Sequence, residues 1–295
     1  MDFASRPAPG TAALPERGER MLVEICAGEL LEAFGASGDN VVFSAVARYA
    51  VGRVARQAAE YDRLVGAGGL GPAGSWALGR MVGEASFSGE GGIPIEGPLV
   101  IASNHPGLSD AIALFSAIPR DDLMVIAARR DFLDALPNTT GRLFIVEDGA
   151  DGLRGSQVVR AAARHLRDGG SLLTFPGGRI EPDPASMDGA VRALSGWSES
   201  LDLFARLVPG LKIVPAVVSG VVSRSALGNP LVYLRRNKED RLWLAATLQL
   251  MFPALYRTDV RVTFGRAIAC PATSRHRSGV SAEVVRRAEA LISAR

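Results

Sequence analysis

A histidine and an aspartate lie five positions apart in residues 104–110, whose sequence is Asn-His-Pro-Gly-Leu-Ser-Asp. The apolar run before them, residues 99–103, predicts a strand that brings His105 to its carboxyl end, where open α/β sheets hold their ligands. The proline and glycine that follow predict a turn, across which Asp110 can fold back onto the imidazole. An imidazole oriented by a carboxylate can take a proton from an attacking hydroxyl. The pair therefore predicts general-base catalysis by His105, with Asp110 as its orienting partner.

The same two residues also fit a structural interpretation. A histidine can cap the end of a strand, and an aspartate is common in the first turn of a helix. In the catalytic interpretation, the amides at the start of the helix predicted from residue 109 could in addition stabilise an oxyanion.

A second segment at the end of a predicted strand could bind a ligand. Pro176, Gly177 and Gly178 form a tight loop whose backbone can approach a substrate, and Arg179 adds a charge suited to phosphate. The alternative is a strand-ending turn with a surface arginine. Residues 213–218 predict a third such strand, in which a proline indicates a strand end or a bulge.

The apolar pattern changes character near residue 87. Before it, three- and four-residue spacings predict helices at residues 15–34, 39–64 and 76–85. After it, predicted strands at 99–103, 123–127, 143–146, 171–175, 213–218 and 260–264 alternate with predicted helices at 109–118, 153–167, 190–206, 241–251 and 282–293. This alternation predicts an α/β domain at residues 88–295, with a mostly parallel sheet flanked by helices. A helical region at 15–87 and a disordered lead at 1–14 precede it.

Two other features have simpler interpretations. Residues 66–71 fit the pattern G-x-G-x-x-G, but a charged helical segment precedes them where a dinucleotide site needs a strand, so they predict a flexible linker. His165 lies among arginines on a predicted helix and indicates a solvated face.

Composition argues against several classes of protein. A net charge of +2 gives no support for nucleic-acid binding, and three scattered histidines with two distant cysteines predict no metal site. The first residues lack the apolar core of a secretory signal, and no apolar run reaches the roughly 18 residues that span a bilayer. We therefore expect a cytoplasmic protein, either soluble or bound to the inner face of the membrane.

One segment could provide such a membrane contact. The apolar run at residues 242–256, which contains Trp243, is preceded by four basic residues: Arg235, Arg236, Lys238 and Arg241. This combination suits an interface with anionic lipid headgroups. A buried core helix with a charged loop ahead of it fits the same pattern.

Taken together, four segments resemble the signature of the glycerol-phosphate and lysophospholipid acyltransferase superfamily. That signature has, in order, an N-H-x4-D block, a G-x-x-F-I-x-R block, an F-P-E-G-T-R block and a V-P-x-x-P-like strand. Residues 104–110 match the first block, and residues 141–147 (GRLFIVE) resemble the second but end in glutamate instead of arginine. Residues 175–179 (FPGGR) resemble the third without its glutamate, and residues 214–217 (VPAV) are similar to the fourth.

The resemblance implies O-acyl transfer from a fatty acyl thioester, carried by coenzyme A or an acyl carrier protein, to a (lyso)phospholipid or related lipid or polyol-phosphate acceptor. It implies His105 as general base and Asp110 as its partner, with no metal, no other cofactor and no covalent intermediate. It also implies that Asn104, Arg142 and the loop at residues 176–179 bind the substrate. The changes at Glu147 and Gly177 leave two alternatives open. These are a non-catalytic lipid- or acyl-carrier-binding protein and a thioester hydrolase.

Overall fold

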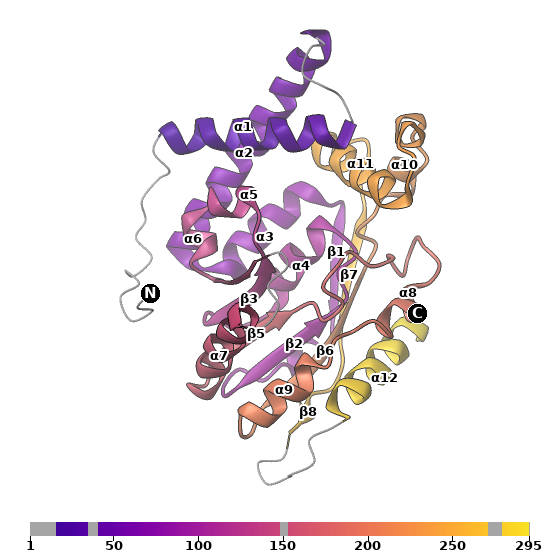
Figure 1. The fold of residues 1–295 in the computed structure, drawn as a ribbon. Helices are drawn as coiled ribbons and strands as arrows, with labels where there is room; N and C mark the ends of the chain where they lie inside the picture. Colours follow the sequence, from indigo (N-terminus) through magenta and orange to yellow (C-terminus); the bar gives the residue numbers. More distant parts are fainter. Residues whose placement is uncertain (1–15, 35–40, 148–152, 271–278, 295) are drawn as a thin grey trace.

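The computed structural model describes residues 16–34, 41–147, 153–270 and 279–294, so the predicted lead at residues 1–14 lies outside the described residues. A sheet with the strand order β1-β7-β6-β2-β5-β3-β4 forms the centre of the described chain, and β8 pairs with β6 (Figure 1). The five strands from β6 to β4 run parallel, whereas β7 and β8 pair with β6 in the antiparallel direction. The predicted α/β class with a mostly parallel sheet is confirmed.

The strands and helices of the described residues have the following bounds, of which those of β2, β4 and α7 coincide with the predicted ranges. The strands are β1 Glu84–Ser88, β2 Leu99–Ser103, β3 Leu123–Ala128, β4 Leu143–Val146, β5 Ser171–Thr174, β6 Lys212–Ser219, β7 Asp259–Phe264 and β8 Ile268–Ala269. The α-helices are α1 Glu16–Phe34, α2 Val41–Gly68, α3 Leu70–Met81, α4 Leu108–Ala117, α5 Asp131–Asp134, α6 Pro137–Thr140, α7 Leu153–Arg167, α8 Ala190–Leu194, α9 Ser200–Leu207, α10 Arg224–Leu227, α11 Lys238–Met251 and α12 Val280–Ser293. The short 3-10 helices η1 Glu90–Gly92 and η2 Pro230–Leu234 complete the described set.

Both faces of the sheet are covered by helices. Successive residues of a strand point to opposite faces, and β2 is buried along its whole length. Leu99 and Ile101 pack in the cluster that contains residues of α2, α3 and α4. Val100 and Ala102 pack with α7, α9 and α12 on the other face. The continuous apolar run of β2 is therefore what a central parallel strand requires.

The glycine-rich segment is not a linker, contrary to the prediction. α2 continues to Gly68 and α3 begins at Leu70, so only Gly69, with φ of 82°, separates the two helices. The segment is ordered by packing, because Gly74 lies against α4 so closely that a Cβ there would stand 3.0 Å from the Ile112 carbonyl oxygen and the Phe115 Cβ. Here tertiary contacts override the weak local preference of the glycines.

Two further predictions were wrong. The helix predicted at 76–85 ends at Met81, and its last residues belong to β1, which pairs in parallel with β7 across the predicted domain boundary at residue 87. The helix predicted at 190–206 is split into α8 and α9, because the chain turns between Ser195 and Glu199. The two regions of the chain also share one apolar core, since α3 packs in the same cluster as β2.

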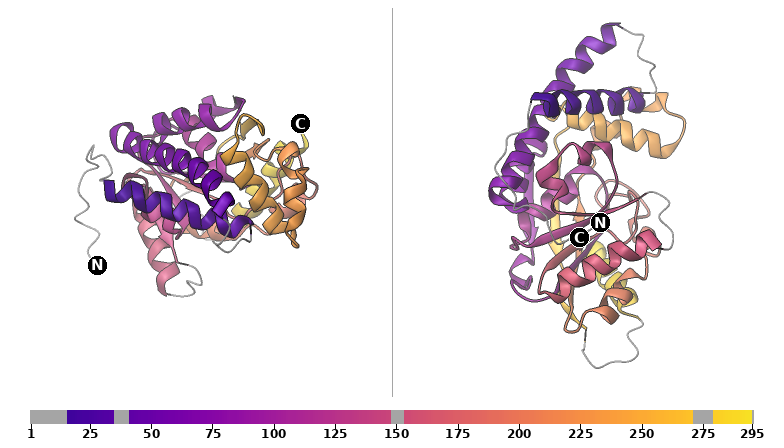
Figure 2. Two further views of the ribbon diagram at one scale, coloured as in Figure 1. Left: turned by 90° about the horizontal axis from the view of Figure 1, so that it is seen from above. Right: turned by 60° about the vertical axis from the view of Figure 1, so that its left-hand side comes forward.

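The helix α1 lies across α2 and beside α11 (Figure 2). Leu244, Ala245 and Leu248 of α11 are buried, so this helix belongs largely to the core. None of the helices in the described ranges is both long and apolar enough to cross a bilayer.

The close contact of α3 with α4 predicts opposite effects for two glycines of the same helix. We expect Gly74→Ala to lower the free energy of unfolding by about 1–3 kcal/mol, because the added methyl overpacks the interface. Gly79→Ala is the matched control, since a Cβ there meets no atom within 4 Å. It should raise the free energy of unfolding by roughly 0.5–1 kcal/mol. Urea unfolding of both variants measures the difference, and equal effects would contradict the packing.

Candidate active site

The catalytic pair predicted from the sequence meets at the carboxyl end of β2. This strand lies between β6 and β5, so the segments that follow all three strands converge there. His105 Nδ1 lies 2.7 Å from Asp110 Oδ2, and the backbone N–H of Gly107 donates to the same oxygen at 3.1 Å. The Asp110 side chain has no solvent exposure, whereas 29% of the His105 side chain is exposed.

This geometry determines which nitrogen of His105 could accept a proton from a substrate. An ionised carboxylate only accepts hydrogen bonds, so Nδ1 must carry the hydrogen and donate it in the hydrogen bond to Asp110. Nε2 of neutral His105 then holds a lone pair, and no other described residue forms a hydrogen bond with it. The ring stacks on Phe175, with centroids 4.4 Å apart and an angle of 25° between the planes, which fixes its orientation.

The electrostatic surroundings favour the protonated imidazole. Burial alone lowers the pKa of His105, but the charge of Asp110, its hydrogen bond and the charge of Glu181 outweigh this effect. The net result is a pKa above the ordinary value of 6.5.

Glu181 is a site residue that the sequence analysis missed. Its Oε2 accepts the backbone N–H of His105 at 3.0 Å, and its Oε1 accepts the indole N–H of Trp197 at 2.8 Å. The carboxyl group is almost fully buried, and burial raises its pKa against the opposing effects of Trp197 and His105. A glutamate five residues after a proline carries no recognisable local signal.

Asn104 was predicted to bind the substrate, and the structure places it immediately beside the catalytic pair. Both ends of its buried amide bond to Val218 of β6: Nδ2 donates to the carbonyl oxygen at 2.9 Å, and Oδ1 accepts the N–H at 2.7 Å. Asp183, also missed from the sequence, joins the next part of the same edge. Its carboxylate accepts the N–H groups of Gly220 and Val222, each at 2.9 Å. These contacts fix the loop after β5 to the end of β6.

The predicted loop at residues 176–179 lies next to the pair. Gly178 adopts φ of 63°, and its N–H closes a turn onto the Phe175 carbonyl oxygen at 3.0 Å. Pro176 is buried and its carbonyl oxygen accepts the N–H of Ser198. The side chain of Arg179 is exposed and points toward Gly196.

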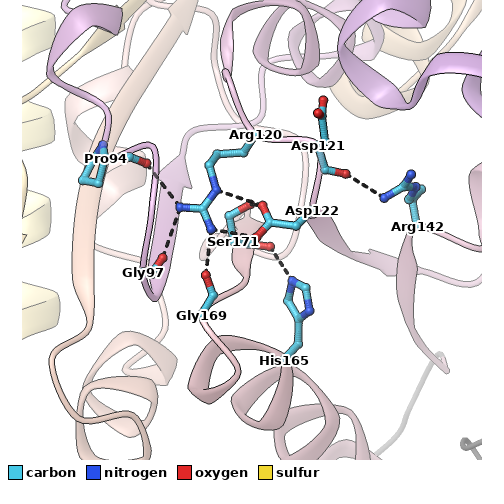
Figure 3. Close-up of polar contacts among 9 residues, drawn as sticks. All are labelled: Pro94, Gly97, Arg120, Asp121, Asp122, Arg142, His165, Gly169 and Ser171. Carbon is cyan, nitrogen blue, oxygen red and sulfur yellow. Dashed lines mark hydrogen bonds and ion pairs between the residues drawn. The ribbon is translucent and has the colours of Figure 1, made fainter.

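Arg142 is not at this site. It immediately precedes β4, at the amino edge of the sheet, and its guanidinium donates to the Asp121 carbonyl oxygen at 2.8 Å (Figure 3). Since His105 lies at the carboxyl edge, the structure does not bring Arg142 together with Arg179. A buried Arg120 organises the amino edge through an ion pair with Asp122 at 2.7 Å and bonds to three carbonyl oxygens.

His165 also lies at the amino edge, and its predicted solvated position was wrong. Its Nε2 lies 3.0 Å from the Ser171 carbonyl oxygen (Figure 3). Its ring also meets the Phe144 ring edge-on. Within the described ranges, no three histidine, cysteine, aspartate or glutamate side chains are grouped so that they could hold a metal ion.

Glu147, which stands where the second block has arginine, lies at the carboxyl end of β4. It pairs with Arg129 of the neighbouring strand end, whose Nε lies 2.9 Å from Glu147 Oε1. Arg129 also pairs with Asp134 at 2.7 Å. The motif arginine would lie at the end of β4, but here a positive charge comes from Arg129 at the end of the neighbouring strand β3.

A small open cleft, with a cavity volume of about 30 Å³, lies beside the histidine loop, between α2, α3, the start of α4 and α11. Gly107 and Ser109, two and four residues after His105, form part of its wall. Most of the remaining lining is apolar: Met81, Val221, Val222, Ala246, Leu250 and Pro253. The Ser109 hydroxyl is buried and has no hydrogen-bond partner among the described residues.

Comparison with known proteins finds similarity among solved structures. No family model and no curated protein sequence matches the chain. The fold is similar to the crystal structure of the 1-acyl-sn-glycerophosphate (LPA) acyltransferase PlsC from Thermotoga maritima, with 15% identity and a TM-score of 0.48. The alignment covers 95% of this chain and 100% of that one. The function is therefore inferred from the geometry of the site.

The contacts of Asn104 predict a structural effect of its replacement. Asn104→Ala leaves the N–H and C=O of Val218 buried without partners, and we expect the free energy of unfolding to fall by about 2–4 kcal/mol. Urea unfolding measures this loss. A variant as stable as the parent, with a raised KM, would instead indicate that Asn104 contacts the substrate.

Proposed function

We propose that this protein is an acyltransferase that moves a fatty acyl group from a thioester to a hydroxyl of a lipid or polyol-phosphate acceptor. One observation carries the proposal: the Nδ1 of the partly exposed His105 is held by the buried Asp110, which leaves Nε2 available as a base. The resemblance of residues 104–110 to the first acyltransferase block supports the same chemistry.

The geometry suits a direct transfer. Nε2 of His105 takes the proton of the acceptor hydroxyl while its oxygen attacks the thioester carbonyl. Asp110 stabilises the imidazolium that forms. As the tetrahedral intermediate collapses, the carbon–sulfur bond breaks, and the departing thiolate receives the proton from His105. The products are the ester and the free thiol of coenzyme A or an acyl carrier protein.

We place only the start of the acyl chain in the cleft, because its cavity volume of about 30 Å³ is too small for a whole chain. Its largely apolar walls favour hydrocarbon. A phosphate of the acceptor would meet Arg179, an exposed arginine of the loop next to the His105–Asp110 pair.

A lipid substrate also suits contact with the inner face of a membrane. The η2–α11 region exposes apolar side chains beside basic ones. The exposed apolar residues are Leu231, Tyr233, Leu234 and Trp243, and Arg236 is exposed between them. We therefore propose a cytoplasmic protein that binds the membrane surface peripherally.

Thiol release provides the first test. Purified protein is incubated with acyl-coenzyme A or acyl carrier protein thioesters and a panel of lysophospholipid and polyol-phosphate acceptors. We expect acceptor-dependent thiol release and ester formation, and a loss of kcat of about 10²–10⁴-fold in His105→Ala. His165→Gln, which changes a histidine at the opposite edge, is the control and should retain activity.

Three results would point elsewhere. Thiol release without an acceptor would indicate a hydrolase. Binding of liposomes or carrier protein without turnover would indicate a non-catalytic protein. Full activity in His105→Ala would rule out the mechanism.

The pH dependence follows from the direction of the shift at His105. Only the neutral imidazole is a base, so kcat/KM should rise with pH as His105 loses its proton, with a midpoint above 6.5. Removal of the Asp110 charge in Asp110→Asn should lower the pKa of His105. The pH profile of the parent and an NMR titration of His105 in both proteins measure these effects, and a parent midpoint below 6.5 would contradict them.

A further inference from the structure

The loop after β5 lacks a side chain at the position where the third acyltransferase block has a glutamate. The residue at that position is Gly177, and a Cβ built there would lie 3.0 Å from the carboxyl carbon of Glu181. The carboxylate of Glu181 therefore occupies the space next to the Gly177 backbone. A Cβ at position 177 would force the carboxylate to shift.

From this position Glu181 forms hydrogen bonds with both the N–H and the C=O of His105. Its backbone N–H donates to the His105 carbonyl oxygen at 2.8 Å, while its Oε2 accepts the His105 N–H at 3.0 Å. Because its Oε1 accepts the Trp197 indole N–H, both carboxylate oxygens have a donor. A buried carboxylate with a donor on each oxygen has one preferred position.

We propose that Glu181 is the positioning residue of the catalytic histidine, and that Gly177 provides the room it needs. Glu181 acts through the His105 backbone and through its charge, whereas Asp110 binds the ring. Two carboxylates thus bond to one histidine from different elements, Asp110 to the ring from α4 and Glu181 to the backbone from the loop after β5. Arg179 is the cation that acts electrostatically on Glu181 from the same loop.

The charge of Glu181 has a consequence that a merely structural contact lacks. A negative charge near the imidazole favours its protonated form, and Glu181 contributes to the raised pKa of His105. Its replacement by glutamine should lower that pKa. Glutamine also has only one acceptor oxygen for two N–H donors, so one of the two hydrogen bonds is lost.

The experiment compares Glu181→Gln with Glu199→Gln, which removes an exposed carboxylate from the start of α9. His105 is titrated by NMR in both variants, with His165 as an internal reference. We expect a lower pKa for His105 in Glu181→Gln and no change in Glu199→Gln. In the acyl-transfer assay, kcat of Glu181→Gln should fall on the order of 10- to 100-fold, with KM for the thioester little changed. The loss should persist at high pH, where His105 is neutral in both proteins.

Gly177→Ala tests the same proposal with Glu181 still in the chain. The added methyl forces the carboxylate to shift, so the pKa of His105 and kcat should fall in the same direction as in Glu181→Gln, but by less, because the charge is retained. Gly91→Ala is its control, because a Cβ there meets no atom within 4 Å.

The rate measurement rests on the proposed function, but the titration does not. If the parent transfers no acyl group while Glu181→Gln still lowers the pKa of His105, the acyltransferase proposal fails and the positioning role stands. An unchanged His105 titration in both Glu181→Gln and Gly177→Ala, with kcat within about twofold of the parent, would overturn the positioning role.

Discussion

The site depends on the burial of one carboxylate. Asp110 has no solvent exposure, and an ionised group removed from water must find donors within the protein. It finds them in the His105 ring and in the Gly107 backbone, which lie within one short turn. This requirement explains why β2 must end at Ser103 and α4 must begin at Leu108, since a longer strand or a later helix would separate the donors from the acid.

The same principle holds the surrounding edge together. Asn104, Glu181 and Asp183 are buried, and each bonds to backbone groups of a neighbouring segment. Together with the apolar contacts of Phe175, Val221 and Val222, they join the ends of β2, β5 and β6. Polar side chains can therefore order the catalytic loops while the wall of the cleft stays apolar.

The sequence predicts what depends on local pattern. The bounds of β2, β4 and α7 coincide with the predicted ranges, and the spacing of His105 and Asp110 indicates their contact. The features that the sequence analysis missed or predicted wrongly depend on contacts with residues far away in the sequence. β1 is a strand because β7 lies beside it, some 175 residues later in the register Glu84 to Asp259. Glu181 meets His105 across 76 positions, and no local rule connects them. Arg142 was placed by its position in a motif, and the direction of β4 carries it to the opposite edge.

The two departures from the family signature have different physical consequences. At the third block, the carboxylate missing from position 177 is supplied from position 181, so a negative group remains next to the histidine. At the second block, the arginine is replaced by Glu147, and the nearest positive charge is that of Arg129, which already pairs with Glu147 and Asp134. A phosphate at that end of the sheet would have to compete with two carboxylates for one guanidinium. Arg179 is exposed on the other side of the catalytic loop. An anionic acceptor would therefore approach His105 from the side of β5 and not from the side of β4.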